Sequence, residues 1–366
     1  MLSAFLTNIR KIEIKDVKIP EPMDGEVIVR VRSALTCGTD LKMYLRGHPK
    51  FKFPMLFGHE CSGVIYKVGA GVKNFKEGDE VMFANSASCG ECYYCRRGDE
   101  NLCVNLFEGI FLGAYSEFAK VPARIVKKNM FIKPKNLSFT QSSFLEPISC
   151  VMNGIRNLNI REGDSVLVIG DGAIGLMFTL AIKKFFNVNL IVAGRHKERL
   201  DIALNFGADE IINVSEFSLF DRLREITSGI GPNLVIECTG KPEVWEESVE
   251  LVAKGGMVIL FGGCPAGTKV NFDATRIHYD QITIKGVFHF TSQDVRKAYE
   301  FLCDNSDELT RLISGKYRIV HIHEVFEKLS RRKGLLNDIS KLFDVERSVE
   351  SFKSYLFNFI KNKNMG

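Results

Sequence analysis

The sequence predicts an α/β protein with two domains, one rich in β-strands and one built on a parallel sheet. Between about residues 164 and 289, continuous apolar runs alternate with stretches of helical spacing, which is typical of strands covered by helices on both faces. Before residue 150, short segments rich in β-branched residues alternate with glycine-containing turns. A chain of 366 residues is also longer than one small core requires.

The expected elements follow from these patterns. In the first part of the chain, strands are expected at 27–31, 62–68 and 80–83. In the middle part, the apolar runs predict strands at 165–169, 190–193, 234–237, 257–261 and 282–288. The helical stretches between them lie at 176–185, 199–205, 219–227 and 244–252. We therefore expect a first domain at 1–152, a second at 153–289, and a return of residues 290–366 to the first domain.

Composition and charge exclude several classes of function. The net charge of +5 is small for this length, and the basic runs at 331–333 and 361–363 are short, which favours a solvated surface over a nucleic-acid site. No apolar run approaches the roughly 18–20 residues of a membrane span. The first residues do not resemble a secretion signal, and four of the ten cysteines lie close together, which favours metal binding in a reducing cytoplasm.

A glycine-rich loop follows the first strand of the middle part. Residues 170–175 read Gly-Asp-Gly-Ala-Ile-Gly, directly after the strand at 165–169 and at the start of a helical stretch. In this context the pattern predicts a dinucleotide site, because the glycines permit a tight turn and close approach of a pyrophosphate to the helix N-terminus. We expect cofactor contacts at Gly170, Gly172, Ala173, Ile174 and Gly175.

The end of the next strand bears on the choice of dinucleotide. An NAD site normally has an acidic residue about 20 positions after the loop. Here the sequence is Ala193-Gly194-Arg195-His196, in which Gly194 leaves room and Arg195 offers a charged fork to a 2′-phosphate. Arg199 supplies a second cation. NADP is therefore favoured over NAD, the alternative being that Arg195 stacks on the adenine of NAD.

Four closely spaced cysteines form the strongest local signal. Cys89, Cys92, Cys95 and Cys103 can surround one tetrahedral Zn²⁺ within a small lobe at 89–103. Such a site has no open coordination position and is structural. The alternatives are an iron–sulfur cluster and an accidental grouping of buried or redox cysteines.

A second set of metal-binding residue types is dispersed. Cys37 lies in Thr-Cys-Gly-Thr-Asp, His59 and Glu60 in Gly-His-Glu, and Glu146 in Leu-Glu-Pro. A thiolate, an imidazole and a carboxylate give three protein ligands and leave one position for water or substrate. That openness is what Lewis-acid catalysis needs.

Taken in order, these motifs resemble the zinc-containing medium-chain dehydrogenase/reductase superfamily over about residues 5–334. The Glu146-Pro147 pair is similar to the sorbitol-type polyol dehydrogenases and threonine dehydrogenase, where liver-type alcohol dehydrogenases have a cysteine ligand. The resemblance implies a GroES-like β-barrel catalytic domain with an inserted Rossmann dinucleotide-binding domain. It also implies a homodimer or homotetramer that acts on a small alcohol or ketone.

The resemblance also assigns roles to individual residues. It implies that Cys37 and His59 bind the catalytic zinc, and that Glu60 is either a third ligand or alternates with water. Glu146 either binds the metal or holds its water, and Thr39 relays the alcohol proton. Thr239, in Cys-Thr-Gly, would line the nicotinamide half of the cofactor site.

The function implied is hydride transfer between a secondary alcohol and NAD(P), giving the ketone. The alternative is a catalytically silent zinc- and dinucleotide-binding redox sensor, which the intact set of hydride-transfer residues disfavours. A zinc-free quinone or enoyl reductase of the same fold lacks these ligands. Substrate contacts are expected in the segments 41–57 and 107–111, and the sequence does not rank the alcohols.

The C-terminal segment departs from the family pattern. After Gly334 the family ends in a short barrel strand, whereas apolar residues here recur at helical spacing. The positions are Ile339, Leu342, Val349, Phe352, Leu356 and Phe359. This spacing predicts an amphipathic helix capped by Asp338. An altered reading frame is the alternative origin of this extension.

Overall fold

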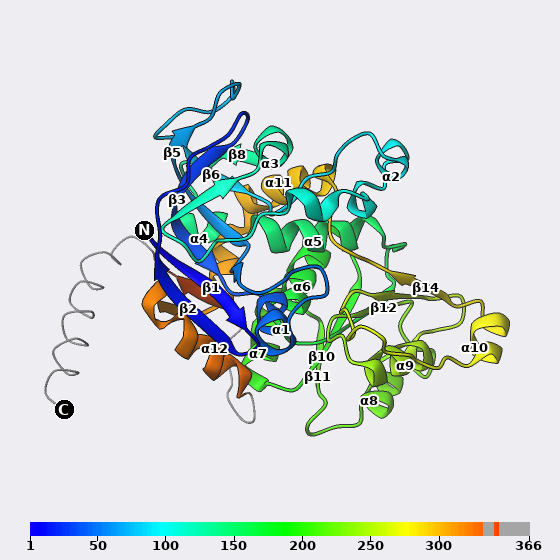
Figure 1. Cartoon of the computed structure of the whole chain (residues 1–366). Helices are drawn as coiled ribbons and strands as arrows, with labels where there is room; N and C mark the ends of the chain where they lie inside the picture. Colours follow the sequence, from blue (N-terminus) through cyan, green and yellow to red (C-terminus); the bar gives the residue numbers. More distant parts are fainter. Residues whose placement is uncertain (332–339, 344–366) are drawn as a thin grey trace, which may run out of the picture. The chain divides into compact units, whose positions relative to one another are not determined.

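The computed structural model describes residues 1–331 and 340–343, and the chain divides into two compact units (Figure 1). The first unit contains Met1–Ser149 and the chain from Thr291 on. The second contains Cys150–Phe290. Among the described residues, no helix has both the length and the apolar character to cross a membrane. The chain thus leaves the first unit once and returns to it.

The second unit is built on a parallel sheet. Within the described residues its strands are β9 (Ser165–Ile169), β10 (Asn189–Gly194), β11 (Glu210–Asn213), β12 (Leu234–Glu237), β13 (Met257–Leu260) and β14 (Thr283–Gly286). They are ordered β11-β10-β9-β12-β13-β14, and every neighbouring pair is parallel. Numbered from β9, this is the 3-2-1-4-5-6 order of the doubly wound dinucleotide-binding fold. The α/β class predicted from the sequence is confirmed.

Helices connect these strands and cover the sheet. They are α6 (Ala173–Phe185), α7 (Lys197–Asn205), α8 (Leu219–Ile226), α9 (Pro242–Leu251) and α10 (Ala274–Tyr279). The core between sheet and helices contains apolar residues such as Leu167, Ile191 and Val235, all without exposed surface. One strand, β11, was missed by the sequence analysis because its four residues include only two apolar ones.

The first unit consists mainly of antiparallel sheets. Its described strands are β1 (Leu2–Asn8), β2 (Lys11–Asp16), β3 (Val27–Leu35), β4 (Met55–Leu56), β5 (Glu60–Val68), β6 (Glu80–Phe83), β7 (Phe118–Val121), β8 (Met130–Ile132), β15 (Ile313–Tyr317) and β16 (Ser340–Phe343). β2, β1 and β4 make one sheet, and β15-β16-β3-β5-β6-β8, with β7 paired to β3, make the other. β3 begins at the predicted residue but continues to Leu35, which carries the chain to Cys37.

Helices that range from the 4 residues of α2 to the 18 residues of α11 lie between these strands in the sequence. Among the described residues of this unit, the α-helices are α1 (Gly38–Arg46), α2 (Tyr93–Arg96), α3 (Ala123–Lys128), α4 (Phe139–Ser142), α5 (Leu145–Arg156), α11 (Ser292–Leu309) and α12 (Ile322–Ser330). The 3₁₀ turns are η1 (Glu100–Leu102), η2 (Leu106–Gly109), η3 (Thr310–Leu312) and η4 (Ile319–His321). α5 begins in the first unit and ends in the second.

Helix α12 closes the core of the first unit. Its apolar residues Ile322, Val325, Phe326 and Leu329 recur at helical spacing and are all buried, which gives the helix one continuous apolar face. The Phe326 ring lies 4.9 Å from the Phe57 ring and 5.5 Å from the Tyr44 ring, measured between centroids. α12 lies against β2 and α1 (Figure 1). It therefore holds in place the helix that follows Cys37.

The C-terminal segment corrects one sequence prediction. Leu342 was expected in an amphipathic helix, but Ser340–Phe343 form β16, parallel to β15 and antiparallel to β3, with Leu342 opposite Leu35. The unpaired backbone edge of β3 offers hydrogen bonds to a strand, and tertiary pairing of this kind overrides a local helical period. The family's final barrel strand is thus present. The remaining positions of the expected helix, including Asp338 and Ile339, lie outside the described residues.

The packing of α12 yields a stability prediction. Phe326→Ala should lower the free energy of unfolding by about 3–5 kcal/mol, because it leaves a cavity among aromatic rings that cannot collapse onto one another. Chemical denaturation followed by circular dichroism measures the change. Met23→Ala, at a side chain that is 63% exposed, is the control and should cost far less. Equal losses for both variants would contradict this role of α12.

Candidate active site

Three potential metal ligands meet at the junction of α1 and β5. Cys37 is the N-cap residue of α1, and its Sγ accepts a hydrogen bond from the Thr39 N–H at 3.4 Å. His59 precedes β5 and Glu60 begins it, and both side chains are buried. One potential ligand atom from each of Cys37, His59 and Glu60 lies within 4.8 Å of the other two. The structure therefore brings together the three residues that the sequence scattered.

A buried carboxylate fixes the orientation of His59. Asp40 has no exposed surface, and its Oδ1 lies 2.9 Å from His59 Nδ1. The Tyr115 hydroxyl donates to Asp40 Oδ2 at 2.5 Å and to the Leu35 carbonyl at 2.9 Å. A proton on Nδ1, donated to Asp40, leaves the lone pair of Nε2 for a metal. Sequence reasoning missed Asp40 and Tyr115 as site residues, although Asp40 stood within the quoted Cys37 motif.

The ionisable groups of this cluster disturb one another. Burial and the neighbouring Glu60 raise the pKa of the Cys37 thiol to about 12. Burial raises the pKa of Glu60 to about 8, and the charges of Glu146 and Asp40 act in the same direction. Burial opposes the charged form of His59, but Asp40 more than offsets it and holds the pKa of His59 well above its usual value. A group of acids crowded in this way is relieved by a bound divalent cation.

The donor set fits zinc. Thiolate sulfur, imidazole nitrogen and carboxylate oxygen are the ligands that Zn²⁺ takes in catalytic sites. Glu146, near the start of α5, is buried and close enough to raise the pKa of Glu60, but its carboxylate is not part of the group of ligand atoms formed by Cys37, His59 and Glu60. The Thr39 side chain is exposed at the first turn of α1.

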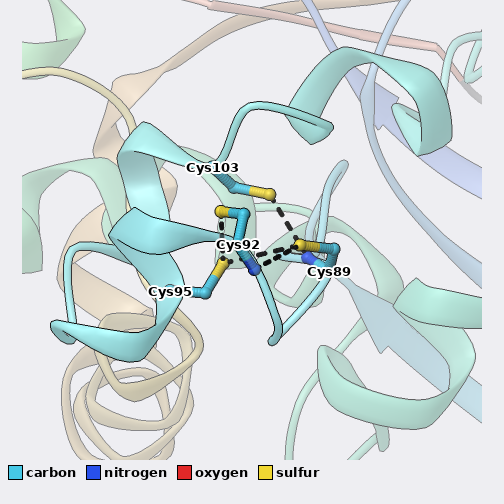
Figure 2. A group of neighbouring side chains, drawn as sticks. All are labelled: Cys89, Cys92, Cys95 and Cys103. Carbon is cyan, nitrogen blue, oxygen red and sulfur yellow. Dashed lines mark hydrogen bonds between the residues drawn. The ribbon is translucent and has the colours of Figure 1, made fainter.

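The four-cysteine lobe forms a second, separate group of ligand atoms. Sγ of Cys92 lies 3.4 Å from Sγ of Cys95, which lies 3.8 Å from Sγ of Cys89, and Cys103 completes the set (Figure 2). These distances are far longer than a disulfide bond of about 2.05 Å. They are the spacing of sulfurs around one tetrahedral ion.

Backbone N–H groups in this lobe point at sulfur. The Cys92 N–H donates to Cys89 Sγ at 3.4 Å, and the Cys89 N–H donates to Cys103 Sγ at 3.3 Å (Figure 2). Hydrogen bonds from the backbone of Cys95 and Val104 lower the pKa of Cys92 to about 6, whereas burial raises the pKa of Cys95 to about 12. N–H donors stabilise thiolates, the form that binds metal. The lobe is therefore suited to a closed metal site.

The glycine-rich loop of the second unit has the geometry of a phosphate cradle. A Cβ at Gly175 would lie 1.8 Å from the Gly170 carbonyl oxygen, so only glycine permits this approach of helix to strand. Gly172 is the N-cap of α6, and a Cβ there would meet open space. The first N–H groups of α6, at Ala173 and Ile174, begin a helix of 13 residues. A partly exposed helix N-terminus with room before it fits a pyrophosphate.

The other residues that were expected to contact the cofactor lie after β10 and β12. The side chain of Arg195 is exposed, whereas Arg199 on α7 is buried. Thr239 follows β12, and both its N–H and its hydroxyl donate to the Glu237 carboxylate. Glu237 is fully buried, and burial raises its pKa. Sequence reasoning missed Glu237, which holds the turn at Thr239 in place.

The space beside Gly194 corrects the sequence interpretation. Gly194 was expected to leave room, with no carboxylate nearby. In the structure a Cβ at Gly194 would lie 2.5 Å from Asp171 Cβ, so the Asp171 side chain from the glycine-rich loop fills that space. A carboxylate is therefore present, supplied by a position 24 residues before Arg195.

Comparisons with known proteins agree with this architecture. Residues 23–130 match the family model of the alcohol dehydrogenase GroES-like domain, and residues 173–304 match that of the zinc-binding dehydrogenases. L-threonine 3-dehydrogenase of Pyrococcus abyssi is 32% identical over 280 residues, which are 75% of this chain and 79% of that protein. The chain belongs to the zinc-binding dehydrogenases. Within this family it is a zinc-type medium-chain dehydrogenase, as the ordered motifs indicated.

Further relatives cover nearly the whole dehydrogenase. Sorbitol dehydrogenase of Bacillus subtilis is 28% identical over 337 residues, 90% of this chain and 93% of that protein. A zinc-binding dehydrogenase of Sinorhizobium meliloti bound to NADP has a TM-score of 0.84 at 26% identity, covering 94% of this chain and 99% of that one. An alcohol dehydrogenase of Escherichia coli, complexed with NADH, has the same score at 30% identity and the same coverage.

The four-cysteine lobe yields a prediction about metal content. Cys92→Ser should remove one zinc ion per chain, because a hydroxyl replaces one of the four sulfurs that close the site. Atomic absorption on the purified dehydrogenase measures the metal. Cys303→Ser, at a half-buried cysteine that belongs to none of the groups of close ligand atoms found among the described residues, is the matched control and should retain all zinc. Loss of the same amount of metal from both variants, or from neither, would contradict a metal site in the lobe.

Proposed function

We propose that this dehydrogenase transfers a hydride between a secondary alcohol, of the polyol, simple-alcohol or sugar-alcohol type, and NAD(P), giving the ketone. The observation that carries the proposal is the convergence of Cys37, His59 and Glu60, with the imidazole already oriented by Asp40. Three protein ligands leave a coordination position for substrate. When bound, zinc supplies a Lewis acid for the alcohol oxygen, and the nicotinamide accepts the hydride.

The chain's own residues divide the remaining work. Cys37 and His59 hold the metal, and Glu60 is a third ligand or exchanges with water. Glu146 binds the metal or holds its water, and its proximity to Glu60 supports either role. Thr39 relays the alcohol proton toward solvent. Its exposed position directly after the Cys37 turn supports this role, because the relay must connect the substrate with water.

The four-cysteine lobe holds a second, structural zinc in this proposal. The close approach of the four sulfurs and the N–H groups directed at them support a closed tetrahedral site. Membership of the zinc-binding dehydrogenases supports zinc over an iron–sulfur cluster in this lobe.

NADP is the proposed preference over NAD. The exposed Arg195 and the buried Arg199 lie at or just after the end of β10, where cations attract a 2′-phosphate. Relatives of similar fold have been captured with either NADP or NADH, so the fold itself does not decide. Asp171 opposes the cations, and the preference is accordingly modest.

The substrate wall is proposed to be aromatic. His48, Phe51 and Phe107 come from the two segments in which substrate contacts were expected, and their ring centroids lie 4.8, 6.0 and 6.2 Å apart. Aromatic faces pack against the C–H surface of a small alcohol without a charge requirement. An assembly of two or four identical subunits is proposed from the family resemblance.

A kinetic screen tests the proposed reaction. Sorbitol, xylulose, L-threonine and simple secondary alcohols and ketones are supplied with NADPH or NADH, or with their oxidised forms. We expect zinc-dependent change in the absorbance of the reduced nicotinamide with at least one pair, faster with the NADP couple. Cys37→Ala should abolish this change, and Cys303→Ser should preserve it. Silence over the whole screen, with zinc bound, would refute the proposal.

The Asp40 contact yields a second test. Asp40→Asn should lower kcat/KM or zinc affinity about 10- to 100-fold, because the amide no longer fixes the His59 tautomer as a carboxylate does. Tyr115→Phe removes one of the hydrogen bonds to Asp40 and should produce a smaller loss. Ser142→Ala, at a buried hydroxyl elsewhere in the same unit, is the control. Unaltered kinetics and zinc content in Asp40→Asn would count against a positioning role.

A further inference from the structure

Asp171 lies where the glycine-rich loop meets the end of β10. Its Oδ2 accepts hydrogen bonds from the Arg195 N–H at 2.9 Å and from the His196 N–H at 2.7 Å. His196 Nδ1 lies 2.9 Å from the same oxygen. The carboxylate is thus tied to the segment that follows β10 by three contacts. Asp171 is 7% exposed, so these contacts replace most of its hydration.

The position of Asp171 depends on Gly194. A Cβ at Gly194 would lie 2.7 Å from both Cγ and Oδ2 of Asp171, so a side chain at position 194 and this placement of the carboxylate exclude each other. Dinucleotide sites normally project an acid from the end of the second strand toward the ribose 2′-hydroxyl. Here that strand end carries glycine, and a carboxylate reaches the same space from the phosphate loop.

The second oxygen of Asp171 has capacity for a ligand. In the part of the chain that the structure describes, Oδ1 accepts no hydrogen bond, and its ion-pair partner is Arg199 Nη1 at 4.0 Å. A ribose hydroxyl can donate to such an oxygen. A 2′-phosphate cannot, and it would place a second negative group beside a buried carboxylate.

We propose that Asp171 is a specificity-determining residue of the dinucleotide site, where it takes the place of the missing strand-end acid. It favours a ribose 2′-hydroxyl and opposes a 2′-phosphate, and so narrows the NADP preference that Arg195 and Arg199 create. This inference rests on the proposed dinucleotide-dependent function and adds to it the residue that balances the two cofactors.

Direct binding to the adenosine end tests the inference. The probes are adenosine 2′,5′-bisphosphate and 5′-AMP, titrated calorimetrically into the full-length protein. Asp171→Asn should tighten the bisphosphate by about tenfold or more, because it removes a negative charge close to the 2′-phosphate. Binding of 5′-AMP should stay the same or weaken. Fluorescence titrations with NADPH and NADH should shift in the same directions.

Matched variants separate this effect from a general change in charge. Asp201→Asn removes a carboxylate from the exposed face of α7, where it pairs with Lys197, and should move both probes little. Asp171→Ser is the second variant in case the amide disturbs the loop, and circular dichroism verifies that each variant is folded. The inference is overturned if folded variants bind both probes with an unchanged ratio. It is equally overturned if the wild-type chain binds neither.

The test is independent of catalysis. Binding of the two probes requires neither zinc nor an alcohol, so an inactive dehydrogenase with an altered probe ratio would sink the proposed reaction and leave the role of Asp171 standing. An active dehydrogenase in which the Asp171 variants bind the two probes with an unaltered affinity ratio would support the proposed reaction and refute the role of Asp171.

Discussion

The active-site cluster depends on the buried carboxylate of Asp40. It lies in the first turn of α1, where its side chain accepts a hydrogen bond from the Cys37 N–H at 3.3 Å and so fixes the start of the helix that presents the thiol. The same carboxylate holds His59 Nδ1 and receives the Tyr115 hydroxyl. The start of α1, the residue before β5 and the buried Tyr115 thereby all bind the Asp40 carboxylate. Because the group has no exposed surface, each of these contacts is also needed to offset its lost hydration.

The packing around Asp40 is equally restrictive. Gly58, directly before His59, has a φ of +85°, and a Cβ there would lie 2.6 Å from the Tyr115 ring. Tyr115 in turn packs edge-on against Phe57 and against Phe326 of α12. The position of the His59 ring is thus tied to α12 through the contacting rings of Tyr115, Phe57 and Phe326. A dense core of this kind has few alternative arrangements, which is how a folded chain keeps ligand atoms in place before any metal arrives.

Sequence patterns foretold what depends on local order. The strands at 165–169 and 234–237 and the strand at 80–83 have the predicted ends, because short apolar or β-branched runs between turns leave little choice. Spacing alone did not foretell contacts between distant positions, and the grouping of Cys37, His59 and Glu60 was expected only from the family resemblance. Asp40 and Tyr115 are 75 residues apart, and no periodicity connects them. Leu342 fits a helical period, yet its backbone pairs with β3, an outcome set by a partner strand and not by its own segment.

The interpretation of the cofactor site at the end of β10 from the sequence has the same limitation. Residue types at fixed spacing indicate which side chains line a site only if each of those side chains comes from its usual position in the sequence. The coupling of Gly194 and Asp171 breaks this assumption, because the volume left free at Gly194 is filled by a side chain from the glycine-rich loop. Charge in that volume is what a ribose or a phosphate encounters, whichever residue supplies it. The absence of an acidic residue after β10 therefore indicates a positively charged site only when the space beside Gly194 is empty. In this dehydrogenase the Asp171 carboxylate occupies that space.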